Sequence, residues 1–312
     1  MSKSLYGFLL VSSVFVFGCA DTEKKADLVV AHQETIQDTT FNKIDFELLK
    51  KELRMEGQEN DGEFKVTVPQ NDLNVTVDGF RIIPPMGLGS WAAFAPGAEQ
   101  VMLMGDIVVT ESDLKPVQEE IIKQGLTITA IHNHFVRNEP DVMYMHIGGM
   151  GDEKKLGRSV KAVFDKVSEV RGANPADTES SSVENTLNTE MIDSILGFQG
   201  KMNNGVYKIT IGRPDVELKE HGALVSTFLG FNTWASWQGT NEKAAVAGDF
   251  TMLADEVAPV IKALVENNIE VVAVHNHMVH EEPRIFFLHY WGVGSVEELA
   301  KGLKAALDQT GK

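Results

Sequence analysis

Cysteine is almost absent from this chain of 312 residues, because Cys19 is the only one. A disulfide needs two cysteines, so no bridge within the chain can hold the fold together. If Cys19 is lipidated, the mature chain has no free thiol and no cysteine ligand. Thiol catalysis and cysteine-based zinc sites are therefore excluded for the mature protein.

Basic residues are also scarce. The chain has 28 Lys and Arg against 45 Asp and Glu, which gives a formal net charge of -17. A nucleic-acid-binding protein needs a basic face, so this balance argues against nucleic acid as a partner. The hydrophobic content of 43% is enough for a packed core, and the length fits one large domain or two ordinary ones.

Long apolar runs are lacking except near the N-terminus, where Lys3 precedes the run Leu5–Gly18. This run is too short for a comfortable membrane span and is typical of a signal peptide. Its last residues lead into Val16-Phe17-Gly18-Cys19, which is similar to a bacterial lipobox, where the cysteine is lipidated and becomes the mature N-terminus. The alternative is an ordinary signal peptide with an incidental cysteine.

The sequence therefore predicts a signal peptide over residues 1–18, followed by lipidated Cys19 and a flexible polar tether to residue 40. The expected location is the cell envelope, outside the cytoplasm, with the membrane contacted through the lipid on Cys19.

The most informative feature is an internal repeat. A shift of 143 residues aligns the two halves, so that Trp91 meets Trp234 and Asp106 meets Asp249. Between His132–Gly151 and His275–Gly294, nine of twenty residues are identical, where average composition gives about one. Gene duplication is the economical explanation. The predicted boundaries are repeat 1 over 41–171, a Ser- and Asn-rich linker over 172–187, and repeat 2 over 188–312.

Each repeat has a mixed pattern of strands and helices. In repeat 1 it predicts short helix 44–53, strands within 64–79, 90–97 and 100–110, helix 113–125, strands 126–135 and 141–149, and helix 152–167. We expect Ser112, and Asp255 in repeat 2, to cap the helix that follows. A short helix at 191–198 opens repeat 2. The predicted fold class is α+β, a tandem duplication of a strand–helix–strand–strand–helix unit with a histidine-bearing β-hairpin in each copy.

Both hairpins contain the pattern His-Asn-His, then Glu-Pro, then a third histidine. If the first hairpin folds about Pro140, His134 lies opposite His146. Side chains alternate along a strand, so His132 and His134 share one face of the sheet. The same arithmetic about Pro283 brings together the second set. The two predicted clusters are His132, His134 and His146 in repeat 1, and His275, His277 and His289 in repeat 2.

Neutral imidazole is the commonest protein ligand for zinc, copper and non-haem iron. Three protein ligands with one open position are the usual composition of a catalytic zinc site. The sequence therefore predicts a divalent transition metal, with zinc favoured. The candidates for a fourth ligand or general base are Asp106, Asp249, Glu139 and Glu282. In the alternative interpretation, the histidines only hydrogen-bond to one another, to Asn133 and to nearby carboxylates.

The aromatic residues of the strands have a simpler interpretation. We expect the four residues at corresponding places of the two repeats to pack in the core or between the repeats rather than to bind a ligand: Trp91, Phe94, Trp234 and Trp237.

The segment from Leu103 to Gly151, with "AIHNHF" and "EPDVMYMHIGGMG", resembles the LppY/LpqO family of bacterial envelope lipoproteins, a domain of unknown function. The resemblance covers nearly the whole mature chain. It implies a secreted or lipid-anchored bacterial protein and brings no established reaction with it. Two hypotheses follow: a metal-dependent enzyme such as a hydrolase, or a non-catalytic module that binds a small molecule, a metal or an envelope protein.

Overall fold

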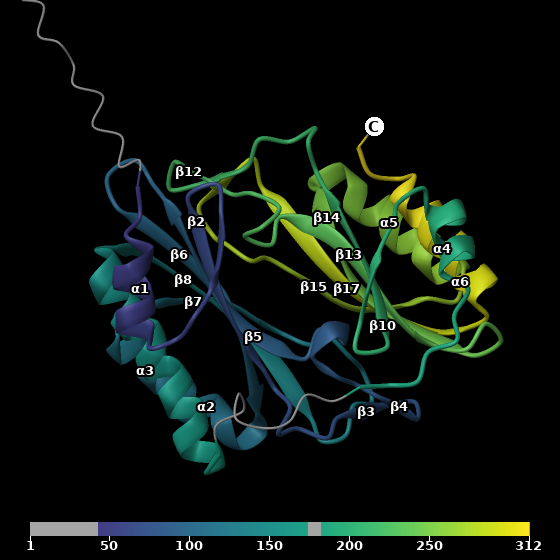
Figure 1. Ribbon diagram of the computed structural model, residues 1–312. Coiled ribbons are helices and arrows are strands. Elements are labelled where there is room, and N and C mark those ends of the chain that lie inside the picture. Colours follow the sequence, from purple (N-terminus) through teal and green to yellow (C-terminus); the bar gives the residue numbers. More distant parts are fainter. Residues whose placement is uncertain (1–42, 174–181, 312) are drawn as a thin grey trace, which may run out of the picture. The chain divides into compact units, whose positions relative to one another are not determined.

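Two copies of one sheet-and-helix unit make up residues 43–173 and 182–311, the part of the chain that the computed structural model describes (Figure 1). The predicted signal peptide, Cys19 and the tether lie outside the described residues. The first copy comprises α1 Phe46–Leu53, β1 Gln58–Asn60, β2 Glu63–Pro69, β3 Thr76–Val77, β4 Phe80–Arg81, the 3-10 helix η1 Pro84–Met86, β5 Gly89–Pro96, β6 Val101–Thr110, α2 Glu111–Lys123, β7 Thr127–His132, β8 Val142–Gly151 and α3 Glu153–Arg171. The second comprises α4 Thr189–Leu196, β9 Lys201–Asn203, β10 Val206–Gly212, β11 Lys219–Glu220, β12 Ala223–Leu224, β13 Asn232–Gly239, β14 Ala244–Leu253, α5 Ala254–Glu266, β15 Glu270–His275, β16 Glu281–Glu282, β17 Ile285–Gly294 and α6 Val296–Leu307.

The main sheet has the same strand order in both copies. In repeat 1 the order is β1-β2-β5-β6-β8-β7, and in repeat 2 it is β9-β10-β13-β14-β17-β15. All neighbours within each main sheet pair antiparallel. The helices α1, α2 and α3 flank the first sheet, and α4, α5 and α6 flank the second (Figure 1). The predicted α+β tandem duplication is therefore confirmed.

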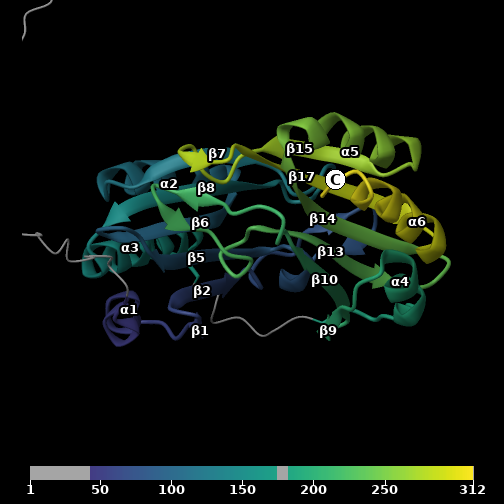
Figure 2. The ribbon, with the colours of Figure 1, turned by 90° about the horizontal axis from the view of Figure 1, so that it is seen from above.

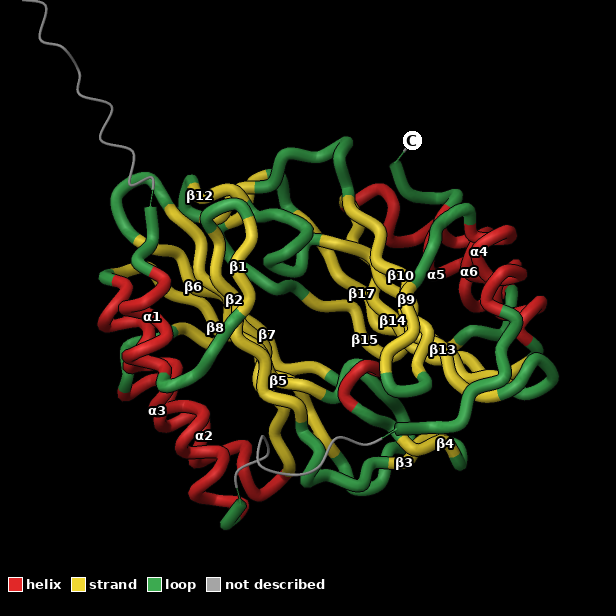
Figure 3. Tube along the Cα trace, viewed as in Figure 1, coloured by secondary structure: helices red, strands yellow, loops and turns green. Residues whose placement is uncertain are grey.

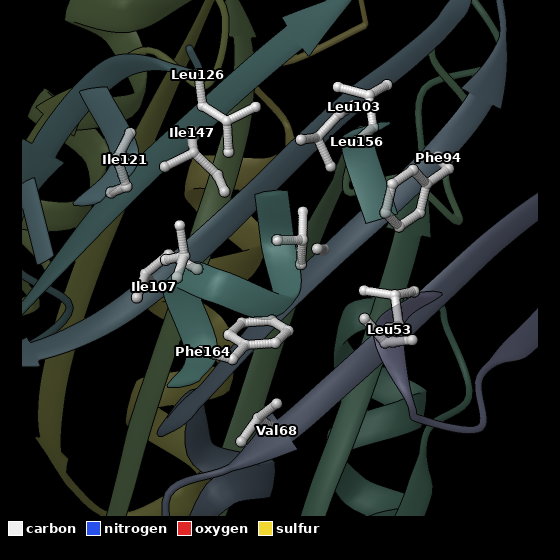
Figure 4. Packing of buried hydrophobic residues seen from close by; sticks show 14 of the residues in the cluster. Leu53, Val68, Phe94, Leu103, Ile107, Ile121, Leu126, Ile147, Leu156 and Phe164 are labelled. Atoms are coloured by element: carbon white, nitrogen blue, oxygen red, sulfur yellow. The ribbon is translucent and has the colours of Figure 1, made fainter. Parts of the chain in front are cut away.

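One face of each main sheet packs against its own helices. Along β6 the alternate residues Leu103 and Ile107 point to this face, where they meet Leu156 and Phe164 of α3 (Figure 4). All four are nearly inaccessible to water, and an equivalent cluster joins the second sheet to α4, α5 and α6. Burying a side chain of this size contributes about 1.5–3 kcal/mol, so these faces hold each unit together.

The other faces of the two main sheets meet each other. Val108 and Tyr144 of repeat 1 share one buried cluster with Ala247 and Trp291 of repeat 2. A second shared cluster includes Met104 of repeat 1 and several residues of the other copy. The described chain therefore has four layers, helix–sheet–sheet–helix, as the view from above shows (Figure 2).

A loop from each repeat lies against the sheet of the other repeat (loops are green in Figure 3). Ser236 on β13 donates a hydrogen bond of 3.0 Å to the carbonyl of Pro85 in η1. In the opposite direction, Lys65 on β2 donates a bond of 3.1 Å to the carbonyl of Phe228, just before β13. We call these two segments, at η1 and around Phe228, the exchanged loops.

The predicted helix caps were wrong by two residues. Helix α2 begins after Thr110 rather than Ser112, and α5 after Leu253 rather than Asp255. In each case the carboxylate three residues into the helix accepts a hydrogen bond from the N–H of the capping residue, at 3.0 Å and 2.7 Å. An acidic residue at this position satisfies a free N–H whatever the cap's own side chain is. None of the helices in the described chain combines the length and apolar character that a bilayer span requires.

Candidate metal centre

The strand pairing that positions the histidines differs from the predicted hairpin. His132 on β7 lies opposite Tyr144 on β8, and Ala130 lies opposite His146. The prediction that His134 faces His146 was wrong, with a register offset of four residues. The reason is a wide connection: Glu139 pairs with Thr76 through backbone hydrogen bonds of 2.9 and 3.0 Å, which draws the loop away from a tight turn.

Repeat 2 has the same register, so the prediction that His277 faces His289 was also wrong. His275 on β15 lies opposite Phe287 on β17, and the loop pairs through β16 with β11.

The histidines of each repeat nevertheless share a face of the sheet. His132 and His146 are diagonal neighbours whose rings stack with centroids 4.7 Å apart and an interplanar angle of 3°. His275 and His289 stack in the same way at 4.8 Å and 11°. The ring of His134 is 5.2 Å from that of His132. The structure therefore brings each predicted set together.

The two sets merge into one cluster, where the sequence predicted one cluster per repeat. His132 and His275 stack across the interface at 3.9 Å. His134 lies 3.8 Å from His289 of the other repeat, and His277 lies 4.0 Å from His146. The arrangement is a six-histidine cluster with approximate two-fold symmetry. In it, the third histidine of each hairpin contacts the second histidine of the other repeat.

The six-histidine cluster is buried and short of hydrogen-bond partners. No histidine of the cluster is more than 8% exposed as a residue, so bulk water does not reach most of the nitrogens. Seven ring nitrogens have no hydrogen-bond partner among the described residues: both of His132, both of His275, and one each of His146, His277 and His289. An unpartnered buried polar atom costs about 1–3 kcal/mol, and these nitrogens could hold a metal ion.

Three of the rings are oriented by backbone carbonyls. Nδ1 of His146 is 3.1 Å from the carbonyl of Gly105, and Nδ1 of His289 is 3.0 Å from that of Gly248. Nδ1 of His134 is 3.1 Å from the carbonyl of Gly87, which belongs to the exchanged loop. A carbonyl only accepts, so each Nδ1 carries the proton and each Nε2 keeps its lone pair. Histidine ligands of metals commonly have this second interaction.

Burial also sets the charge of the cluster. Burial lowers the pKa of five imidazoles well below the ordinary histidine value, and neighbouring imidazoles lower it further. The five belong to His132, His134, His275, His277 and His289. These imidazoles are therefore neutral near pH 7. Neutral imidazole is the form that binds metals.

Two of the four predicted carboxylates lie at the cluster. Asp106 is directly opposite His146 on the neighbouring strand, and Asp249 is opposite His289. Their Oδ2 atoms are 3.5 Å from Nε2 of His134 and of His277, respectively. Burial raises the pKa of both carboxyl groups. Both are placed to serve as a further ligand or as a base.

The other two carboxylates are elsewhere. Glu139 and Glu282 are exposed, and their backbones pair with Thr76 and Lys219. In the part of the chain that the structure describes, neither lines the cavity beside the cluster. The structure does not bring them to the histidines.

Three combinations of side chains place their ligand atoms within 4.8 Å of one another. Two of them combine both repeats. The groups are His132, His146 and His275; His132, His134 and His289; and Asp249, His275 and His277. Three nitrogen or carboxylate ligands match the protein ligands of many zinc sites.

A cavity of about 350 Å³ opens beside the six-histidine cluster, lined by matching residues of the two repeats. Trp91 and Trp234 are in its wall, whereas Phe94 and Trp237 are fully buried in the core. Lys65 and Lys208 also line it, and sequence reasoning missed them as site residues. The signal was available, because the shift of 143 residues aligns these two lysines as well.

Comparisons with known proteins agree with the duplication. A family model described as a Domain of Unknown Function (DUF1259) matches residues 47–166 and again residues 190–309. The two matches are offset by the same 143 residues as the repeat. No curated protein matches the chain.

Among solved structures, the chain is similar to the trimeric bacterial microcompartment shell protein PduB, with 9% identity, 81% of this chain and 89% of the other covered, and a TM-score of 0.19. EtuB from Clostridium kluyveri matches at 8% identity, with the same coverages and TM-score. A TM-score this low supports no conclusion about the present fold or function.

Proposed function

The chain belongs to the family described as a Domain of Unknown Function (DUF1259), in two tandem copies, and we propose that its six-histidine cluster binds a divalent transition metal, with zinc favoured. The observation that carries the proposal is the set of seven buried imidazole nitrogens without a hydrogen-bond partner in the described chain. Histidines that served structure alone would be expected to bond to one another or to carbonyls.

We further propose that the metal centre is hydrolytic. Zinc in such a site supplies Lewis acidity and lowers the pKa of a coordinated water. Asp106 and Asp249 border both the histidines and the cavity, at 3.5 Å from His134 and His277. One of these carboxylates would accept the proton of the attacking water. A substrate would enter through the cavity.

Metal analysis of the purified protein tests the first proposal. We expect bound zinc in the wild type and its loss in His134→Ala and His277→Ala. The control is His221→Ala, because the side chain of His221 is 43% exposed and its ring contacts His280 rather than the cluster. Circular dichroism checks that each variant is folded. A folded wild type that takes up no zinc, copper or iron would contradict the proposal.

Activity and coordination test the second proposal. Zinc-loaded protein should hydrolyse a p-nitrophenyl ester or phosphate, and Asp106→Asn or Asp249→Asn should reduce the rate about 100-fold. X-ray absorption should reveal one ligand that exchanges with solvent. Zinc coordinated only by histidine, with no turnover, would instead favour a non-catalytic binding module.

For the location, we propose an envelope lipoprotein anchored through Cys19, as the resemblance to LppY/LpqO proteins implies. The support is the apolar run that ends in Val16-Phe17-Gly18-Cys19. Wild-type protein should fractionate with membranes and incorporate labelled palmitate. Cys19→Ser should lose both properties, and equal labelling of the two proteins would contradict the anchor.

A further inference from the structure

We infer that the cavity beside the six-histidine cluster binds a small organic anion with a carboxylate or phosphate group, held between Lys65 and Lys208. This inference rests on the proposed function for the reacting centre, and it names the chemical class of the substrate. The two lysines come from equivalent positions of β2 and β10, and both line the cavity.

The lysines are fixed by the tryptophans of the cavity wall. The Lys65 ammonium lies 4.2 Å from the centre of the Trp91 ring, and the Lys208 ammonium lies 4.0 Å from that of Trp234. Such cation–π contacts hold a charged group in place without using its N–H donors. Both side chains are half-buried, so the pocket presents two positioned ammonium groups.

Most of the donors of these ammonium groups are unused. An ammonium has three N–H donors. Lys65 uses one on the carbonyl of Phe228, and Lys208 makes no hydrogen bond to the residues described. Within ranges 43–173 and 182–311, neither lysine forms an ion pair within 4.0 Å, although Asp106 and Asp249 line the same cavity. An anionic oxygen group would accept the remaining donors.

The two positive charges also repel each other. Burial lowers the pKa of Lys65 to about 8, and burial together with repulsion by Lys65 lowers that of Lys208 to about 8. Two like charges in one cavity are unfavourable until an anion joins them. Asp106 and Asp249 line the same cavity and offset part of this repulsion, because each favours the charged form of one lysine.

The size of the cavity limits the anion. A volume of about 350 Å³ is near the lower end of the range for small-molecule sites. It equals about a dozen water molecules at roughly 30 Å³ each. Thr67, Thr210 and Asn232 add uncharged polar groups to the wall. A compact carboxylate or phosphate compound fits, whereas a polymer chain must remain mostly outside.

Titration calorimetry of the zinc-loaded, full-length protein tests this inference with two probes, inorganic phosphate and malonate. We expect the wild type to bind at least one of them. Lys65→Met and Lys208→Met, which keep an apolar stem, should each weaken binding about tenfold or more. Lys65→Arg, which keeps the charge, should retain most of the affinity. The matched control is Lys243→Met, because Lys243 is exposed and lies over Phe80, outside the cavity.

Zinc content measured on the same samples separates the two proposals. Retained zinc with weakened anion binding in both Met variants supports the inference. Retained zinc with unchanged affinity, or a wild type that binds neither probe at millimolar concentration, would overturn it and leave the metal proposal standing. If the wild type holds no zinc but binds the anion, and the lysine variants bind it more weakly, the metal proposal fails and the anion pocket remains. Preference for phosphate over malonate, or the reverse, identifies the anionic group.

Discussion

Replacing His132 by leucine should stabilise the metal-free protein. Both ring nitrogens of His132 are buried without a partner in the described chain, and each such atom costs about 1–3 kcal/mol. The substitution removes both atoms. It also loses the stack on His275, 3.9 Å away, which is worth about 0.5–1.5 kcal/mol. The two atoms together cost about 2–6 kcal/mol, so the expected net gain in the free energy of unfolding is about 0.5–5.5 kcal/mol, with a central value of about 3 kcal/mol.

Zinc should reverse this order of stability. A ligand that binds only the folded state at 1,000 times its Kd adds about 4 kcal/mol to the free energy of unfolding. His132 belongs to two of the three ligand groups, so its loss should remove most of this gain. The variant is therefore expected to be more stable than the wild type in chelator and less stable in zinc.

Urea unfolding followed by tryptophan fluorescence measures both states, once with EDTA and once with excess zinc. The control His221→Leu should match the wild type in both conditions, because that side chain is 43% exposed. If His132→Leu is clearly less stable than the wild type in EDTA, the histidines stabilise the fold without a metal. The buried ring nitrogens of His132 would then not destabilise the metal-free protein.

Two more predictions concern buried polar groups of repeat 1. Arg171→Ala should lower the free energy of unfolding by about 3–5 kcal/mol in urea titrations, because it leaves a buried carboxylate without its partner. Gln70→Arg added to that variant should recover most of the loss, since the aligned residue Arg213 makes the equivalent contacts in repeat 2; no recovery would contradict the symmetry argument. Tyr144→Phe should leave thermal stability unchanged or raise it by a few degrees, because the Tyr144 hydroxyl is buried without a partner and Phe287 is its counterpart. A marked drop in the melting temperature would mean that the hydroxyl has a role.

The sequence predicted the architecture because an alignment of its two halves reveals the duplication. The shift that pairs Trp91 with Trp234 also pairs the helices and strands. Strand alternation placed His132 and His134 on one face, and the predicted hairpin added His146 to that face. The face was right although the register was wrong, because an offset of four residues is even. The sequence also indicated Asp106, which the structure places opposite His146. These inferences needed only local pattern and one symmetry.

The register and the joining of the two clusters needed contacts that local pattern does not contain. The hairpin is shifted because Glu139 pairs with Thr76, which lies 63 residues earlier in the chain. Alternation gives the face on which a side chain lies but not what covers that face. The approach of His134 to His289 therefore followed from the packing of two sheets, which the sequence alone did not reveal.

The contacts between histidines of the two repeats make the six-histidine cluster a joint product of both copies. The imidazole nearest His277 belongs to His146 of the other copy, and two of the three candidate ligand groups combine both copies. A gene that encoded one copy would have needed two molecules to meet through the same sheet face. Fusion fixes that encounter within one polypeptide. It leaves each half free to acquire its own differences, such as Tyr144 against Phe287, while both contribute to one six-histidine cluster.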